Sequence, residues 1–155
     1  MITLKEGDQA LAFTAQDQNG KAHSLADYTG RKIVLYFYPE DDTPTCTIQA
    51  CNLRDNYALL KKAGFVVLGV SPDTGKKHKK FETKYKLPFT LLADPGHTII
   101  NKYGVWGEKE LFGRRYMGVH RTTFVIDEKG IIRNIFTRPK NRQHAEEILE
   151  AFRAT

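Results

Sequence analysis

The chain is poor in cysteine, since Cys46 and Cys51 are the only two in its 155 residues. Two cysteines do not make a disulfide scaffold, because small secreted domains of that kind carry several pairs. In a reducing compartment a cysteine pair is more often catalytic or metal-binding than structural. The scarcity of cysteine therefore directs attention to the role of this one pair.

Long apolar runs are also missing. The longest cover residues 33–38 and 65–70, whereas a membrane-spanning helix needs about 20 residues. The first eight residues lack the apolar core of a secretory signal. We therefore expect a soluble, cytoplasmic protein that makes no membrane contact.

Composition predicts one folded domain, spanning residues 1–155. Hydrophobic residues make up 41% of the chain and aromatic residues 11%, enough for a packed core. The net charge is +6, and basic residues peak at Lys76-Lys77-His78-Lys79-Lys80. This run is either a nucleic-acid patch or a solvated helix face. No zinc-finger spacing, RNA-binding signature or glycine-rich phosphate loop accompanies it, so we expect no nucleic-acid partner.

Strand and helix patterns alternate along the chain. Continuous runs of β-forming apolar residues predict buried strands at 33–38 and 65–71, and further strands are expected at 88–94 and, as a short one, at 10–16. Helical patterns cover 74–85, 97–103 and 143–152, and a longer one runs from Pro44, with Thr43 or Asp42 as its cap, to a stop at Gly64. Residues 122–127 and 131–137 flank a turn and predict a hairpin.

This order of elements predicts an α/β class and a thioredoxin-like fold, with a central mixed β-sheet flanked by helices on both faces. A βαβ unit followed by a ββα unit is typical of that fold, and here an insertion separates the two halves. Catalytic groups in such sheets gather beyond the carboxyl ends of the strands. The segment from Pro39 to Cys46 follows the strand at 33–38, so we expect it to lie there.

The spacing of the two cysteines predicts a redox switch. A thiol in the first turn of a helix meets the positive end of the helix dipole and unpaired N–H groups, which both favour thiolate. In one regular helix, Cα atoms five residues apart are separated by roughly 8.6 Å, while a disulfide needs about 4.4–6.8 Å. The first turns must therefore unwind before Cys46 and Cys51 can bond, which a static structural disulfide would not require.

The chemistry that fits such a switch is peroxide reduction, in which a thiolate becomes a sulfenic acid and a second thiol condenses with it. Thr43 can place a hydroxyl over the helix start, and an arginine would be a suitable cation because it stays charged. Two other functions remain open. One is a thioredoxin-like disulfide reductase, although its usual Cys-x-x-Cys is tighter than the spacing here. The other is a non-enzymatic module that binds a metal or nucleic acid.

The motif Pro39-x-x-x-Thr43-x-x-Cys46 is identified as the active-site motif of the peroxiredoxins. The chain closely resembles their bacterioferritin-comigratory-protein subfamily (Bcp or PrxQ), in order and over nearly its whole length. The resemblance implies a peroxiredoxin-type insertion and an N-terminal extension on the thioredoxin-like fold. The stretches that carry it are 36–55, 67–71, 89–94, 103–109 and 116–127.

By that resemblance, Cys46 is the peroxidatic cysteine and Cys51 the resolving one. Thr43 holds the peroxide and the thiolate, Pro39 shields the pocket, and Arg121 orients the thiolate and polarises the substrate. The family reduces hydrogen peroxide and organic hydroperoxides, is commonly recycled by thioredoxin, and needs no metal or organic cofactor. The resemblance thus implies an atypical 2-Cys thiol peroxidase, recycled by thioredoxin or a similar dithiol, and we expect a monomer or weak homodimer.

Thr45 departs from the family pattern, which usually has glycine at this position. A β-branched residue is strained at positive φ, so we predict that Thr45 has ordinary helical geometry. Its bulk bears on the substrate range and on the mobility of the first turn, and it leaves the thiol chemistry intact.

Overall fold

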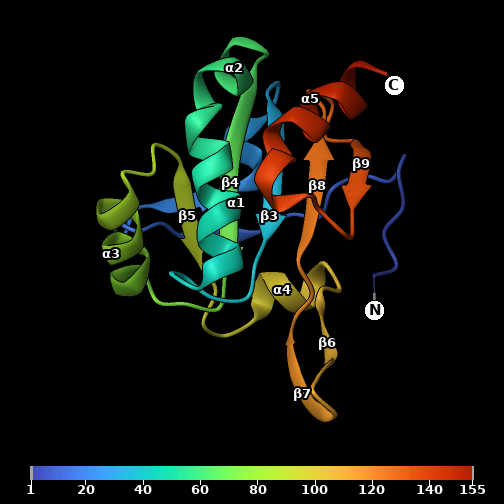
Figure 1. Cartoon of the computed structure of the whole chain (residues 1–155). Helices are drawn as coiled ribbons and strands as arrows, with labels where there is room; N and C mark the ends of the chain where they lie inside the picture. Colours follow the sequence, from blue (N-terminus) through green and yellow to red (C-terminus); the bar gives the residue numbers. More distant parts are fainter. Residues whose placement is uncertain (1, 155) are drawn as a thin grey trace.

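The structure, a computed structural model, describes residues 2–154. Within them, a seven-stranded mixed sheet has the order β2-β1-β5-β4-β3-β8-β9, and its strands β3, β4 and β5 are parallel. Two further strands form a separate ribbon that projects from the body of the molecule (Figure 1). The strands are β1 (Thr14–Gln16), β2 (Ala22–Ser24), β3 (Lys32–Phe37), β4 (Phe65–Ser71), β5 (Thr90–Ala93), β6 (Trp106–Leu111), β7 (Arg114–Val119), β8 (Thr122–Ile126) and β9 (Ile132–Phe136).

Helices cover both faces of the sheet, as predicted. The helices are α1 (Pro44–Asp55), α2 (Tyr57–Lys62), α3 (Gly75–Tyr85), α4 (Thr98–Lys102) and α5 (His144–Arg153), with short 3-10 turns η1 (Leu25–Tyr28) and η2 (Asn141–Gln143). Apolar residues of α1, α2, α3 and α5 join one core cluster, and those of α4 join the other. None of these helices is long and apolar enough to cross a membrane.

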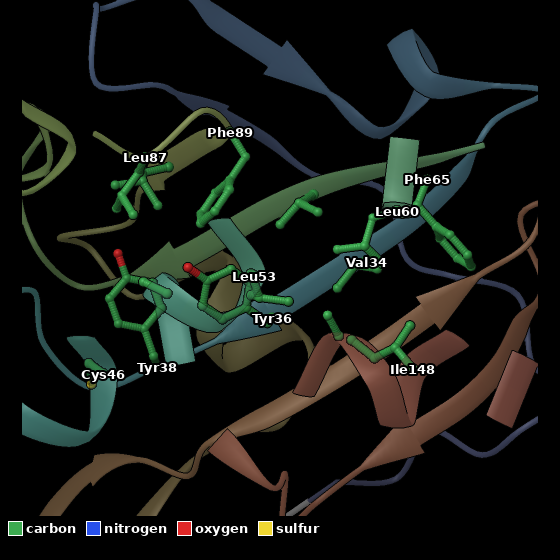
Figure 2. Close-up of a cluster of buried hydrophobic side chains, with 14 of the residues drawn as sticks. Val34, Tyr36, Tyr38, Cys46, Leu53, Leu60, Phe65, Leu87, Phe89 and Ile148 are labelled. Carbon is green, nitrogen blue, oxygen red and sulfur yellow. The ribbon is translucent and has the colours of Figure 1, made fainter. Parts of the chain in front are cut away.

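Strand β3 builds both halves of the core because its side chains alternate between the two faces of the sheet. Val34 and Tyr36 belong to the cluster under α1 and α5, as does Tyr38 just beyond the strand, whereas Leu35 and Phe37 belong to the cluster on the α4 side. Figure 2 shows the first cluster, with Cys46 at its margin near Tyr38. Burial on both faces therefore fixes the end of β3, from which the chain enters the segment before α1.

The single helix predicted between Pro44 and Gly64 is wrong, since α1 ends at Asp55 and α2 begins at Tyr57. Asn56 breaks the helix with φ −109° and ψ 13°, and its side chain donates to the Asn52 carbonyl at 2.9 Å. Asparagine side chains compete with helical backbone hydrogen bonds in this way. The break lies beyond both cysteines and leaves their part of α1 regular.

The ribbon of β6 and β7 was not expected from the sequence, and the strands predicted at 10–16 and 88–94 are shorter than expected. Most ribbon side chains are exposed, so no alternation of buried apolar residues marks the two strands. The turn places Phe112 at φ 52° and Gly113 at φ 75°. Tight hairpin turns with two positive φ values usually carry Asn-Gly, and Phe-Gly offers only half of that signal.

Gly69 in β4 lets Tyr36 pack against the sheet. A Cβ on Gly69 would approach Cζ of Tyr36 to 2.9 Å and Cδ2 of Leu91 to 3.0 Å, and both neighbours are buried. We predict that Gly69→Ala lowers the free energy of unfolding by about 1–3 kcal/mol in urea denaturation, because the core is overpacked. Gly96→Ala is the control, since its Cβ would meet Thr98 Oγ1 at 3.8 Å. Equal stability of the two variants would contradict this packing.

Candidate active site

Cys46 is the third residue of α1, after the N-cap residue Thr43 and Pro44 at the first helical position. Proline suits that position because its φ is preset and its missing N–H would have no helical partner. Cys46 is only 2% exposed, although the first N–H groups of a helix remain available as donors beside it. Thr45 lies within the helix and has no positive φ, which confirms the prediction for this residue.

Arg121 directs its guanidinium at the sulfur of Cys46. Nη2 donates to Sγ at 3.1 Å, and Nη1 donates to Oε1 of Gln49 at 2.7 Å. Strand register explains this placement, because β8 pairs with β3 up to Thr122 opposite Phe37, and Arg121 comes directly beyond the ladder. A positive donor at this distance stabilises negative charge on the sulfur.

Gln49 was not singled out from the sequence. It is fully buried one turn after Cys46. Its Oε1 accepts a hydrogen bond from Arg121 and thereby orients the guanidinium group. Its Nε2 has no hydrogen-bond partner among the described residues. The three-residue spacing from Cys46 puts both on one helix face, but a glutamine in a helix is too common for that spacing to be a signal.

Lys109 brings a second positive charge from the ribbon, and it too was absent from the predicted site. Its half-buried side chain donates from Nζ to the Val119 carbonyl at 3.0 Å. Burial lowers the pKa of Lys109, and the positive charge of Arg121 lowers it further. The Cys46 group raises the pKa of Lys109 by a smaller amount. Lys109 is therefore coupled electrostatically to both groups that meet at the sulfur.

Thr43 and Pro39 lie in the segment that joins β3 to α1. The Thr43 hydroxyl donates to the Glu40 carbonyl at 3.0 Å and makes no capping hydrogen bond to the helix. Its proton is thus engaged, and its lone pairs remain to accept from a ligand. Pro39 is half-buried and lies two residues beyond Phe37, the last residue of β3.

Cys51 lies in the same unbroken helix as Cys46, and neither sulfur is in a disulfide. Burial raises the pKa of the Cys51 thiol, while Arg54 lowers it and Asp55 raises it. Regular helix geometry keeps the two Cα atoms roughly 8.6 Å apart, beyond the range of about 4.4–6.8 Å for a disulfide. The structure therefore represents the reduced protein with α1 folded.

A buried thiol at a helix start, a guanidinium bonded to it and a second thiol in the same helix define a cysteine-based peroxidase site. Residues 6–135 match the model of the AhpC/TSA family. The putative peroxiredoxin Bcp of Haemophilus influenzae is 47% identical over 154 residues, which cover 99% of each chain. Peroxiredoxin Bcp of Escherichia coli K12 is 46% identical over 149 residues, covering 96% of each. The chain therefore belongs to the AhpC/TSA family of thiol-dependent peroxiredoxins, and the predicted resemblance to Bcp is confirmed.

Solved structures agree with this assignment. PrxQ of Xylella fastidiosa superposes with a TM-score of 0.92 at 28% identity, covering 99% of this chain and 98% of that one. A Xanthomonas campestris bacterioferritin comigratory protein, whose trapped-intermediate and ligand complexes concern alkyl peroxide reduction, has a TM-score of 0.85 at 30% identity, with 92% and 90% coverage. These likenesses confirm the predicted thioredoxin-like fold.

The forked contact of Arg121 leads to a direct test. We predict that Arg121→Lys slows peroxide oxidation of Cys46 by about 100-fold or more, measured by stopped-flow, because an ammonium cannot bond Gln49 and the sulfur in this fixed geometry. The control is Arg133→Lys, since Arg133 pairs with Asp127 elsewhere in the fold, and it should react like the wild type. Undiminished oxidation of Arg121→Lys would rule out the role given to this contact.

Proposed function

We propose that the chain reduces hydrogen peroxide and organic hydroperoxides through Cys46 and Cys51, and that thioredoxin or a similar dithiol restores the two thiols. The observation that carries this proposal is the 3.1 Å contact between Arg121 Nη2 and Cys46 Sγ at the start of α1. The names of the Escherichia coli and Haemophilus influenzae relatives support peroxidase chemistry. The alkyl peroxide reduction by the Xanthomonas campestris protein supports the inclusion of organic hydroperoxides.

In the first step, the Cys46 thiolate attacks one peroxide oxygen. A sulfur–oxygen bond forms, the oxygen–oxygen bond breaks, and the other oxygen leaves as water or alcohol after it takes a proton. Arg121 and the N–H groups at the start of α1 stabilise the negative charge that develops on the departing oxygen. The Thr43 hydroxyl oxygen accepts a hydrogen bond from the peroxide O–H. Pro39 shields the reacting atoms from water.

In the second step, the Cys51 thiolate attacks the sulfenic sulfur of Cys46. The disulfide bond forms, the sulfur–oxygen bond breaks, and the oxygen leaves as water after it takes the proton that the Cys51 thiol released. The separation of the two residues in α1 requires that the first turns of this helix unwind beforehand. A dithiol then reduces the disulfide by exchange, and α1 refolds around the free Cys46 thiol.

We propose that the protein works as one domain over residues 1–155, in the cytoplasm, as a monomer or weak homodimer, without a cofactor and without a nucleic-acid or membrane partner. The basic run of α3 supports a solvated face, since Lys79 bonds Glu82 at 2.8 Å and Lys77 bonds Glu40 at 2.7 Å. Disulfide reductase activity is the weaker alternative, because such reductases usually carry Cys-x-x-Cys, a tighter spacing than the five-residue separation of Cys46 and Cys51.

The two cysteines have different predicted phenotypes. Cys46→Ser should abolish peroxide consumption in a coupled thioredoxin assay, because the attacking sulfur is gone. Cys51→Ser should consume one equivalent of peroxide and then stall as the Cys46 sulfenic acid, which a dimedone adduct detects by mass spectrometry.

The wild type serves as the control for this pair of variants. After peroxide treatment it should lose the mass of two hydrogens, mapped to the peptide that joins Cys46 and Cys51. Turnover by Cys46→Ser would refute the assignment of the attacking residue. Full turnover by Cys51→Ser with thioredoxin alone would refute the assignment of the resolving residue.

A further inference from the structure

His78 is a fully buried residue in the middle of a lysine-rich helix, and the chemistry described above does not use it. It lies on α3 beside Phe81, with exposed Lys79 and Lys80 next in the sequence. The sequence placed it within a charged run and gave no sign of its burial. Histidine is seldom buried without a partner, because unpaired ring nitrogens are unfavourable away from water.

The partner of His78 is Asp41, in the segment that carries Thr43. Nδ1 of His78 lies 2.5 Å from Oδ2 of Asp41, and Oδ1 of Asp41 accepts from the Tyr38 hydroxyl at 2.5 Å. The backbone N–H of Asp41 donates to Asp73 at 2.7 Å. Asp41 is only 2% exposed although both of its sequence neighbours are exposed. The loop of residues 39–43 is therefore fixed to the core at Asp41, through both its carboxyl group and its backbone N–H.

The second nitrogen of His78 determines the protonation of the pair. Nε2 lies 3.0 Å from the Leu92 carbonyl, and a carbonyl only accepts, so Nε2 carries a proton. The contact between Nδ1 and Asp41 then holds one more proton, whichever of the two atoms it is closer to. The pair is thus neutral in total, and the His78 ring makes two directed hydrogen bonds, one to Asp41 and one to the Leu92 carbonyl.

The acidic residues on either side of Asp41 also contact α3, but at the surface. Glu40 pairs with Lys77 at 2.7 Å, and Asp42 bonds Lys84 at 2.8 Å and the Tyr85 hydroxyl at 2.7 Å. Exposed ion pairs of this kind contribute little because water screens them. Loss of one partner from a buried hydrogen-bonded pair has a much larger effect, since the other is left uncompensated.

Asp41, Asp73 and His78 could also be considered as metal ligands, because one ligand atom of each lies within 4.8 Å of the others. Their ligand atoms already bond to one another and to neighbouring groups. Asp73 Oδ2 receives the Ser71 hydroxyl as well as the Asp41 N–H, and Oδ1 lies 3.1 Å from Lys77 Nζ. These contacts describe a hydrogen-bonded anchor, with the acceptors of both carboxylates in use.

We propose that the Asp41–His78 pair is a positioning element for the peroxide step. It fastens the loop of residues 39–43 to α3 and thereby holds Thr43 and the first turn of α1 in the arrangement that Arg121 and Cys46 require. The pair lies outside the turns that unwind, so the second step proceeds without breaking it. This inference rests on the proposed function of Cys46 and Cys51.

Two substitutions of His78 separate its two hydrogen bonds. In His78→Gln, the glutamine amide can take the place of Nε2 and keep the hydrogen bond to the Leu92 carbonyl, but the bond to Asp41 is lost. In His78→Asn, the asparagine amide can take the place of Nδ1 and keep the bond to Asp41, but the bond to Leu92 is lost. In single-turnover stopped-flow, we expect His78→Gln to slow oxidation of Cys46 by about tenfold, because small misplacements are amplified in the reacting geometry. Disulfide formation in His78→Gln should be as fast as in the wild type or faster. His78→Asn should restore most of the wild-type rate of Cys46 oxidation.

Lys84→Met is the matched control, because it removes an exposed contact between α3 and the same loop. The rates of Cys46 oxidation and of disulfide formation in this variant should both stay within about twofold of the wild type. Tyr38→Phe provides a milder variant that keeps the buried ring and removes one bond to Asp41, and it should slow only the first step.

The positioning role is overturned if His78→Gln and Tyr38→Phe oxidise at the wild-type rate, or if both steps slow equally. It is also overturned if His78→Asn is no better than His78→Gln, since the Asp41 contact would then be irrelevant. Failure of the proposed function has a different signature, because the wild type itself would then form no disulfide with peroxide.

Discussion

The first turns of α1 must be folded for one step of the reaction and unwound for the next. Cys46 is held beside Arg121 only while this part of the helix is folded, and it can bond Cys51 only when the same part is unwound. Both requirements follow from the five-residue spacing in a single helix. Arg121 and Gln49 make their contacts in the folded arrangement of these turns.

Three parts of the scaffold converge on this helix start. The buried end of β3 fixes where the loop begins, the register of β8 brings Arg121 beyond the last ladder pair, and α3 fastens the loop through Asp41. Gln49 completes the arrangement from within α1 by orienting the guanidinium. Lys109, brought by the projecting ribbon, is coupled electrostatically to Arg121 and Cys46. The Cys46 thiol is thus surrounded by segments that are distant in the sequence.

Much of the fold could be predicted because the buried elements carry strong patterns. The continuous apolar runs of β3 and β4, and the apolar face of α5 with Ala145 and Ile148, match the structure closely. The ribbon was missed because exposed strands need no apolar alternation, and the break in α1 depends on the side chain of one asparagine. Apolar patterns in the local sequence indicate which elements are buried, and they do not identify strands or helix breaks that face water.

The same reasoning applies to the site. Cys46, Thr43 and Arg121 were predicted as site residues from a motif and a family resemblance, whereas the contact between Arg121 and Gln49 joins residues from different elements. His78 lies among lysines whose charge suggested a fully exposed helix face, and its burial depends on the three-dimensional position of Asp41. Pairings between distant elements cannot be read from either local sequence alone.

Amide hydrogen exchange along α1 reports on its unwinding, with reduced and peroxide-oxidised protein compared by mass spectrometry or NMR. In the reduced form the N–H of Thr47 donates to the Thr43 carbonyl at 2.9 Å, so protection should begin at this residue and continue through Cys51. In the oxidised form these amides should lose their protection, while amides of α5 keep theirs. Equal protection of residues 47–51 in both forms, with the Cys46–Cys51 disulfide present, would contradict the account.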